Sequence, residues 1–253
     1  MSAAAERSMS PAASVTGPLV PSDAAAPGGA SAPGGRYVRA VLWDMDGTLI
    51  DSQPVWDEAF VRRCEALGGT VSADQIAGIK GASIRRTREL IADTGATSAW
   101  DDPASAEVFA GMAQDVAAAV RAHPPILPGA REITSAMVET GLAQAIVTQS
   151  PRPIVEAVAH ELGDIFIALV TGDDGLPGKP APAPYAEAMS RLGLTADQCV
   201  AVEDSATGAA SARSNNLHVI QIGGEKHFPA DPGLVVVPHL ASVTPHLLLW
   251  AER

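Results

Sequence analysis

The feature of this sequence that most constrains its fold is a short apolar run that ends at two aspartates and a glycine, Asp44, Asp46 and Gly47. The run has the character of a buried strand, and Gly47 permits the chain to coil away from it just after Asp44. Two carboxylates that converge at the end of a strand repel each other unless a cation, a proton or a lysine offsets their charge. The stretch therefore favours a site with a divalent metal, a nucleophile and an acid/base pair.

The second half of the chain alternates apolar runs with amphipathic segments. Alternating strands and helices are typical of a parallel sheet whose functional residues lie at the carboxyl ends of its strands. We therefore predict an α/β fold, a Rossmann-like doubly wound parallel sheet with a small inserted helical cap domain. The strands predicted after the first one span residues 143–147, 167–170, 199–202, 217–222 and 234–236. A last helix is predicted over residues 243–250.

The stretch between the first strand and this alternating region has helical patterns and no strand pattern. The spacing of its apolar residues predicts helices over residues 55–67, 72–79, 83–91 and 102–123. We expect a helical cap domain over residues 54–127, inserted into a core domain of residues 37–53 and 128–253. Residues 1–36 are rich in Ala, Ser, Pro and Gly. They bury too little apolar surface to offset the entropy of ordering, so a disordered tail is expected.

Three further polar groups follow predicted strands or stand in the loops after them. The hydroxyl of Thr148 and the backbone N–H of Gln149 can hold a phosphate oxygen at a helix N-terminus. Lys179 stands in a loop stiffened by prolines, where an ammonium near the first aspartate would offset carboxylate and phosphate charge. Glu203 and Asp204 follow another strand, and their oxygens suit Mg²⁺. Each group alone is also compatible with a helix cap or a solvated side chain, but the set in this order favours phosphoryl transfer.

These groups resemble the four motifs of the haloacid dehalogenase superfamily, and the helical insertion resembles the small helical cap of its subfamily IA. The resemblance covers nearly all of residues 38–250 and implies a Mg²⁺-dependent phosphatase. It implies that Asp44 is the nucleophile that forms an aspartyl-phosphate and that Asp46 is the acid/base group. Thr148 and Lys179 would hold the phosphoryl oxygens. The implied metal ligands are Asp44, Asp46 through its backbone carbonyl, Asp204 and the nearby Glu203.

Substrate choice is expected to depend on the cap and on the loop after the second motif. The candidate substrate contacts are Trp56, Lys80, Ser83, Arg85 and Gln149. The similar β-phosphoglucomutases carry a His where this chain has Trp56 and a phosphate-binding Arg where it has Ile84, with Arg85 one place later. These differences favour a phosphatase that acts on a sugar or polyol phosphate. A phosphomutase is the first alternative, and a non-catalytic interaction or regulatory protein of the same fold is the second.

The composition narrows the choice of partners. The net charge of −12, from 29 acidic and 17 basic residues, disfavours nucleic acid, whereas a small phosphorylated metabolite fits a site with local positive charge. No apolar run approaches membrane-spanning length, so no membrane partner is expected. Cys64 and Cys199 form no metal-ligand pattern, and a reducing cytoplasm fits their number. The sequence is compatible with a monomer or a homodimer.

Overall fold

The computed structural model describes residues 38–223 and 233–248, and its centre is a six-stranded parallel sheet. The strand order is β3-β2-β1-β4-β5-β6, so the strand that precedes the two aspartates lies in the middle of the sheet. The strands are β1 Ala40–Trp43, β2 Ala143–Val147, β3 Ala168–Val170, β4 Cys199–Glu203, β5 His218–Ile222 and β6 Leu234–Val237. Every neighbouring pair is parallel, so the carboxyl ends of all the strands lie along one edge.

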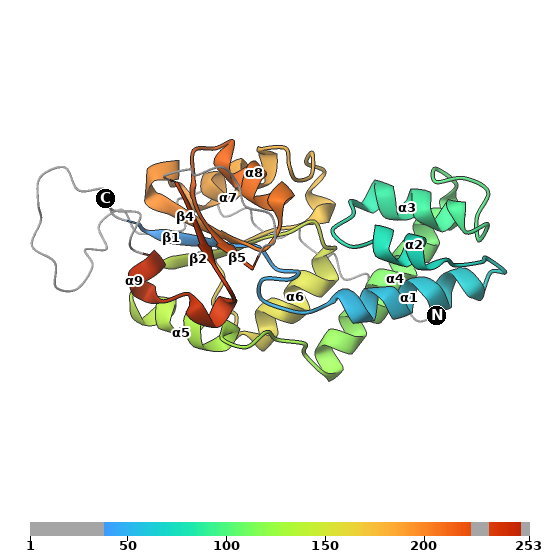
Figure 1. Ribbon diagram of the computed structural model, residues 1–253, viewed down its shortest axis with the longest axis horizontal. Coiled ribbons are helices and arrows are strands. Elements are labelled where there is room, and N and C mark those ends of the chain that lie inside the picture. The colour runs from blue at the N-terminus through green and yellow to red at the C-terminus, as the bar shows by residue number, and fades with distance from the viewer. Residues whose placement is uncertain (1–37, 224–232, 249–253) are drawn as a thin grey trace, which may run out of the picture.

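Helices cover both faces of this sheet (Figure 1). The core helices are α5 Ala130–Glu139, α6 Arg152–Glu161, α7 Ala183–Leu192, α8 Ala206–Arg213 and α9 Pro245–Leu248. Alternate residues of β1 point to opposite faces of the sheet. Val41 and Trp43 belong to the apolar cluster that contains residues of α5, α6 and α9, whereas Ala40 and Leu42 belong to the cluster that contains residues of α7 and α8. The predicted α/β fold with a doubly wound parallel sheet is confirmed.

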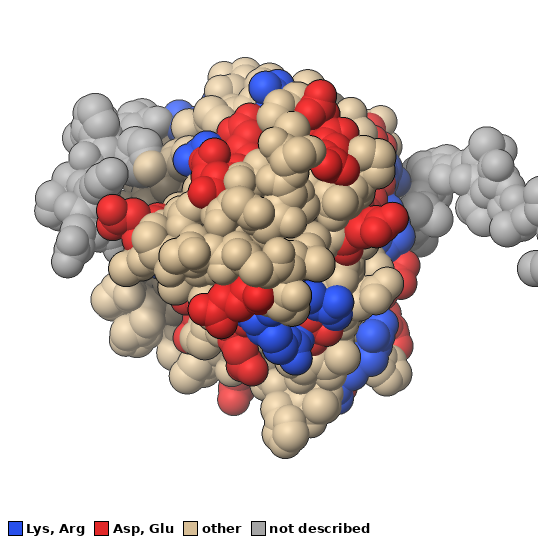
Figure 2. Space-filling model, turned by 90° about the vertical axis from the view of Figure 1, so that its right-hand side faces the viewer, with Lys and Arg blue, Asp and Glu red and all other residues tan. Residues whose placement is uncertain are grey.

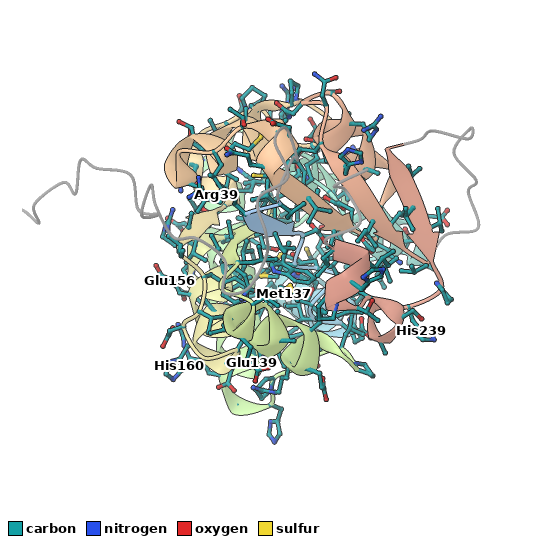
Figure 3. All side chains as sticks on the ribbon, turned by 90° about the vertical axis from the view of Figure 1, so that its left-hand side faces the viewer. Arg39, Met137, Glu139, Glu156, His160 and His239 are labelled. Carbon is teal, nitrogen blue, oxygen red and sulfur yellow. The ribbon has the colours of Figure 1, made fainter. Side chains whose placement is uncertain are left out.

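Helix α5 shows how one amphipathic segment serves this arrangement. Ile133 and Met137 are buried and four residues apart, so they share one face of the helix. In Figure 3, Met137 lies against the interior of the molecule while Glu139 lies at its outside. The helix thus covers the sheet with its apolar stripe and leaves its polar side to solvent.

Four helices form a separate group to the right in Figure 1, which we call the cap. They are α1 Gln53–Glu65, α2 Ala73–Gly78, α3 Ile84–Asp93 and α4 Pro103–Ala122. The side chains of Ser72, Ser83 and Asp102 each accept a backbone N–H in the first turn of the helix that follows. These three residues therefore act as the N-caps that start α2, α3 and α4.

The two connections between the cap and the sheet run side by side. Ile50 forms an antiparallel bridge with Ile126, and the Asp51 N–H donates to the carbonyl of Pro125 over 2.8 Å. The chain therefore leaves the core and returns to it at one place. This pairing agrees with an inserted unit, although the domain limits at residues 54 and 127 stay a prediction.

Several element ends differ from the predicted ones. β3 begins one residue later than predicted, and α1 begins at Gln53, two residues earlier, because Pro54 suits the first turn of a helix. The last predicted helix begins only at Pro245, and its final two residues lie outside the described residues, as does the predicted tail of residues 1–36. Among the helices described here, none has the length and apolar character needed to cross a membrane.

Candidate active site

The predicted site residues come together where the chain leaves the three central strands. Asp44 directly follows β1, Thr148 directly follows β2, and Glu203 ends β4 with Asp204 next to it. The Asp44 N–H continues the sheet ladder by donating to the carbonyl of Val202 over 2.9 Å. The strand order reverses between β1 and β4, which is the usual place for a ligand in an open α/β sheet.

The turn after Asp44 depends on the glycine at position 47. Gly47 has a φ of +90°, and its N–H donates to the carbonyl of Ile50 over 2.8 Å. This left-handed conformation favours glycine because it lacks a Cβ. A Cβ at this position would lie 2.0 Å from Oδ2 of Asp204. Gly47 therefore bends the chain out of the strand, as the sequence predicted, and also leaves room for the last carboxylate of the site.

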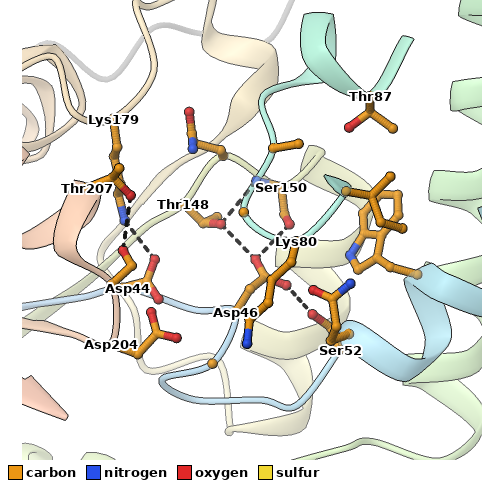
Figure 4. A pocket seen from close by; sticks show the side chains of 18 of the residues that line it. Asp44, Asp46, Ser52, Lys80, Thr87, Thr148, Ser150, Lys179, Asp204 and Thr207 are labelled. Atoms are coloured by element: carbon orange, nitrogen blue, oxygen red, sulfur yellow. Dashed lines mark hydrogen bonds and ion pairs between the residues drawn. The ribbon is translucent and has the colours of Figure 1, made fainter. Parts of the chain in front are cut away.

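Lys179 reaches the centre of the site from the loop that follows β3 (Figure 4). Its Nζ donates to Asp44 Oδ1 over 2.7 Å, to Glu203 Oε1 over 2.6 Å and to the Val147 carbonyl over 2.8 Å. The side chain is only 4% exposed. Burial by itself would lower the pKa of this ammonium, but the carboxylates of Asp44 and Glu203 raise the pKa overall. Lys179 is therefore a fixed positive charge against the first aspartate.

Asp46 accepts hydrogen bonds from three hydroxyl groups at the cavity wall (Figure 4). Ser52 Oγ donates to Oδ1 over 2.5 Å, and Ser150 Oγ and Thr148 Oγ1 donate to Oδ2 over 2.7 and 3.0 Å. Burial raises the pKa of the Asp46 carboxyl, the hydroxyl donors oppose this, and the charge of Asp44 adds to it. A carboxyl group with a raised pKa can carry a proton to a leaving group.

Three residues at this site were missed by the sequence analysis. Tyr185 is fully buried, and its hydroxyl donates to Glu203 Oε1 over 2.6 Å. Ser52 and Ser150 hold Asp46, as described above. Serine is common in turns, and a tyrosine on an amphipathic helix has the pattern of a core residue. The one available signal was that Ser150 stands two positions after the predicted Thr148.

An acidic cluster lies beside Lys179 and consists of Asp44, Glu203 and Asp204. One carboxylate oxygen of each lies within 4.8 Å of the others. Oδ2 of Asp44 is buried and has no hydrogen-bond partner among the described residues. Burial and the neighbouring charges of Asp44 and Glu203 raise the pKa of Asp204 to about 7. A hard divalent cation would relieve both the unpaired oxygen and the accumulated negative charge, so these residues fit such an ion.

A cavity of about 470 Å³ extends from these carboxylates to the cap. Asp44, Asp46 and Lys179 line it from the core, and apolar side chains line much of the cap side. Trp56 and Phe109 stack there with their ring centroids 6.1 Å apart. The cavity thus has a strongly charged end in the core and an apolar wall on the cap, against which the uncharged part of a ligand can pack.

The candidate substrate contacts divide into two groups. Those that line the cavity are Trp56, Lys80 and Gln149. Ser83 instead caps α3, and Arg85 pairs with Glu89 over 3.0 Å and lies 4.6 Å from the ring centroid of Trp100. Neither of the two is in the cavity lining, whereas Ile84 is. One residue along a helix turns the side chain by about 100°. The predicted direct contacts of Ser83 and Arg85 therefore have no support in this geometry.

The outer face of the cap carries charges of both signs. Figure 2 views this end and shows Lys and Arg side chains close to Asp and Glu side chains. Ion pairs within the cap include Arg62 with Asp115 over 2.6 Å and Arg86 with Glu89 over 3.1 Å. The described part of this face therefore offers no large basic area to a polyanion.

The fold and the site together suit phosphoryl transfer, because a carboxylate held by a lysine lies next to a carboxyl group with a raised pKa and to a cluster of carboxylates that could hold a cation. Comparison with protein families identifies the class of enzyme to which the chain belongs. The family model of haloacid dehalogenase-like hydrolases matches residues 38–216. The chain belongs to this family.

Individual proteins that are similar to this chain support the assignment to this family. Hexitol phosphatase B of Escherichia coli K12 is 30% identical over 191 residues, which are 74% of this chain and 84% of that protein. The phosphorylated carbohydrates phosphatase of Thermotoga maritima is 28% identical over 188 residues, 72% of this chain and 84% of that protein. The crystal structure of a β-phosphoglucomutase from Clostridium difficile has the same fold, with a TM-score of 0.72, 16% identity, and coverage of 85% of this chain and 97% of that one. The protein is an enzyme of the phosphatase type, which sets aside the non-catalytic alternative.

Proposed function

We propose that this enzyme hydrolyses a small sugar or polyol phosphate through an aspartyl-phosphate intermediate, with Mg²⁺ as its cofactor. The observation that carries the proposal is the placement of Asp44. Its Oδ1 is held by Lys179 over 2.7 Å, while its Oδ2 is buried without a partner among the described residues and within the acidic cluster. A carboxylate oriented in this way, at the end of a cavity and next to Asp46, is suited to attack a phosphate group.

In the first step a carboxylate oxygen of Asp44 attacks the phosphorus, and the bond between the phosphorus and the ester oxygen breaks. Lys179 and the hydroxyl of Thr148 offset the charge on the phosphoryl oxygens. The raised pKa of Asp46 favours its protonated form, which gives a proton to the leaving alkoxide. The products of this step are an alcohol and a phosphorylated Asp44.

In the second step water replaces the alcohol. Asp46, now ionised, accepts a proton from the water as its oxygen attacks the phosphorus of the acyl phosphate. The bond between the phosphorus and the Asp44 oxygen breaks, which releases inorganic phosphate, restores the Asp44 carboxylate and leaves Asp46 protonated for the next cycle. Division into two displacements replaces one difficult attack of water on a phosphate ester by two easier steps.

The proposed ligands of Mg²⁺ are Asp44, the backbone carbonyl of Asp46 and Asp204, with Glu203 close by. A bound Mg²⁺ would supply positive charge that lets a phosphate group approach a carboxylate. The carboxylate oxygens of the acidic cluster support Mg²⁺ over metals that prefer nitrogen or sulfur ligands.

The cavity supports a leaving group the size of a sugar. Its volume of about 470 Å³ lies in the range of small-molecule sites. Trp56 and Phe109 offer an apolar surface, and Lys80 and Gln149 offer hydrogen-bond donors. Carbohydrates present both C–H faces and hydroxyl groups, so this mixture of contacts suits them. The names of the two related phosphatases, a hexitol and a carbohydrate phosphatase, support the same class.

The placement of the cap residues favours a phosphatase over the mutase alternative. A mutase that moves a phosphoryl group within a sugar phosphate has to bind phosphate at both ends of its substrate. Ile84, at the position where the similar mutases carry a phosphate-binding Arg, lines the cavity, and Arg85 pairs with Glu89 outside the lining. Lys80 is the one basic residue that the cap contributes to the described lining.

Phosphate release from a panel of sugar, polyol and short-acid monophosphates tests the proposed function. We expect release in the presence of Mg²⁺ that falls by at least about 100-fold after chelation and returns when Mg²⁺ is restored. Isomerisation of a hexose phosphate with little release would favour the mutase instead. Absence of turnover with every ester, despite bound Mg²⁺, would contradict the proposal.

Lys80 and Arg85 form a matched pair that tests the limits of the substrate site. Lys80→Met is expected to raise KM for the preferred ester about tenfold, because the ammonium at the cavity attracts the phosphate dianion. Arg85→Met removes the same charge from outside the cavity and should leave KM within about twofold. Steady-state kinetics at saturating Mg²⁺ measure both values. Equal effects of the two substitutions would show that surface charge, rather than a contact in the cavity, attracts the substrate.

A further inference from the structure

Glu203 is held more tightly than a metal-binding carboxylate requires. Its side chain is fully buried. Oε1 accepts hydrogen bonds from Lys179 Nζ and from the Tyr185 hydroxyl, both over 2.6 Å, and Oε2 accepts one from Ser205 Oγ over 3.1 Å. Hydrogen bonds to an ionised carboxylate are among the stronger ones in proteins. These three donors therefore fix the orientation of Glu203.

Helix α8 closes another side of the same carboxylate. A Cβ on Gly208 would lie 2.0 Å from both Oε1 and Oε2 of Glu203. The Gly208 N–H donates to Ser205 Oγ over 3.0 Å, which keeps the first turn of the helix in place. Glu203 therefore has no space to turn toward α8.

Tyr185 contacts both members of the Lys179–Glu203 ion pair. It lies near the start of α7, and its ring centroid is 5.3 Å from Lys179 Nζ. Its hydroxyl donates to Glu203, and this bond satisfies a polar group that is otherwise buried among apolar residues. The tyrosine therefore supports the lysine directly through its ring and indirectly through the glutamate.

We propose that Tyr185 is a positioning residue of this enzyme: its hydroxyl holds Glu203 against Lys179, and Lys179 in turn holds Asp44 in the orientation for attack. The chain of contacts runs from Tyr185 through Glu203 and Lys179 to Asp44, with every link between 2.6 and 2.7 Å. This inference rests on the proposed function, because it takes Asp44 as the nucleophile. The inference also gives Glu203 a second role besides its place near the proposed metal ligands, which is to hold Lys179 in position.

The test variant is Tyr185→Phe, which keeps the buried ring and removes the hydroxyl. We expect kcat for phosphate release to fall about tenfold and KM to stay within about twofold, because a hydrogen bond to a charged group is lost but no substrate contact is. A residue that acts only on folding would lower the melting temperature and leave kcat of the folded protein unchanged.

A second readout needs no substrate and no metal. The chain contains three lysines, Lys80, Lys179 and Lys226, so the NMR signals of their ammonium groups can be told apart. Lys179 makes three hydrogen bonds and is 4% exposed, so its ammonium protons should exchange slowly with water. Lys179→Arg assigns this signal by removing it. In Tyr185→Phe the exchange should become about tenfold faster.

Thr134→Val is the matched control. Thr134 is fully buried on α5, and its hydroxyl donates to the Ala130 carbonyl over 2.7 Å. The substitution also removes one buried hydroxyl, but away from the site, so kcat and the Lys179 signal should not change. Glu203→Gln serves as a second test variant, because it keeps the shape of the side chain and weakens its contact with Lys179. It should accelerate the exchange in the same direction.

The outcomes separate this inference from the proposed function. An unchanged Lys179 signal in Tyr185→Phe or Glu203→Gln would overturn the positioning role, as would an equal change in the Thr134→Val control. An unchanged kcat in folded Tyr185→Phe would overturn it too. If the signal changes as expected in a protein that releases no phosphate from any ester, the support of Lys179 by Tyr185 and Glu203 is upheld, whereas the proposed function is refuted and the role of this support in catalysis with it.

Discussion

Asp44→Asn should abolish phosphate release, with a fall in kcat on the order of 10⁴-fold or more, while the protein stays folded. An amide oxygen is a poor nucleophile and cannot form the proposed acyl phosphate. The substitution keeps the shape of the side chain and an oxygen that can accept from Lys179, whose Nζ lies 2.7 Å from Asp44 Oδ1. Phosphate release measures the loss, and acid quenching during turnover should trap phosphate on the wild-type protein only.

The control for this substitution is Asp164→Asn in the turn that follows α6. The Asp164 side chain is 69% exposed, and the backbone of this residue has a φ of +53°, a conformation that Asn also tolerates. It makes the same change in charge and should keep kcat within about twofold of the wild-type value. Turnover by Asp44→Asn at a rate near that of this control would show that water attacks the ester directly, and the aspartyl-phosphate mechanism would have to be abandoned.

Lys179→Met should damage both stability and catalysis. It removes the positive charge that separates the buried carboxylates of Asp44 and Glu203. Loss of one partner from a buried ion pair leaves uncompensated charge, so the free energy of unfolding should fall by about 3 kcal/mol. The variant also lacks the ammonium that orients the nucleophile, and kcat should fall about 10³-fold. Urea denaturation and phosphate release under folding conditions measure the two effects separately.

Lys80→Met makes the same substitution at an exposed lysine. It should change the free energy of unfolding by no more than about 0.5 kcal/mol, because an exposed charge interacts weakly through water. Equal stability of the two variants would show that the buried pairs of Lys179 do not contribute to folding. A normal kcat in Lys179→Met would show that this lysine has no role in catalysis.

The fold and the motif residues that directly follow strands could be predicted because both follow from simple periodicity. Apolar runs separated by helical segments predict parallel strands, and residues directly after parallel strands, such as Asp44 and Thr148, fall on the same edge of the sheet. Lys179 was harder, because it stands in a loop nine residues after β3 ends at Val170. Its placement depended on the resemblance of its motif to a known family.

The residues that act through other side chains could not be predicted in this way. Tyr185 has the spacing of a core residue on an amphipathic helix, and its contact with Glu203 appears only when α7 is packed on the sheet. In the cap, a shift of a single position decides whether a side chain enters the cavity. Ile84 enters the cavity and Arg85 does not. The helical periodicity of the sequence predicts which residues share a face, but it does not predict which face of the helix turns toward the cavity.

The paired connections of the cap have a consequence for how this chain can be rebuilt. Because the Asp51 N–H and the Pro125 carbonyl are 2.8 Å apart, the segment between them begins and ends at a single junction. A short turn could close that junction, and a foreign helical module could be spliced into it without moving the strands that carry Asp44 and Thr148. The two adjoining ends thus make this segment a natural unit for exchange, and a chimera that keeps phosphate release but changes its preferred ester would show that the segment determines selectivity.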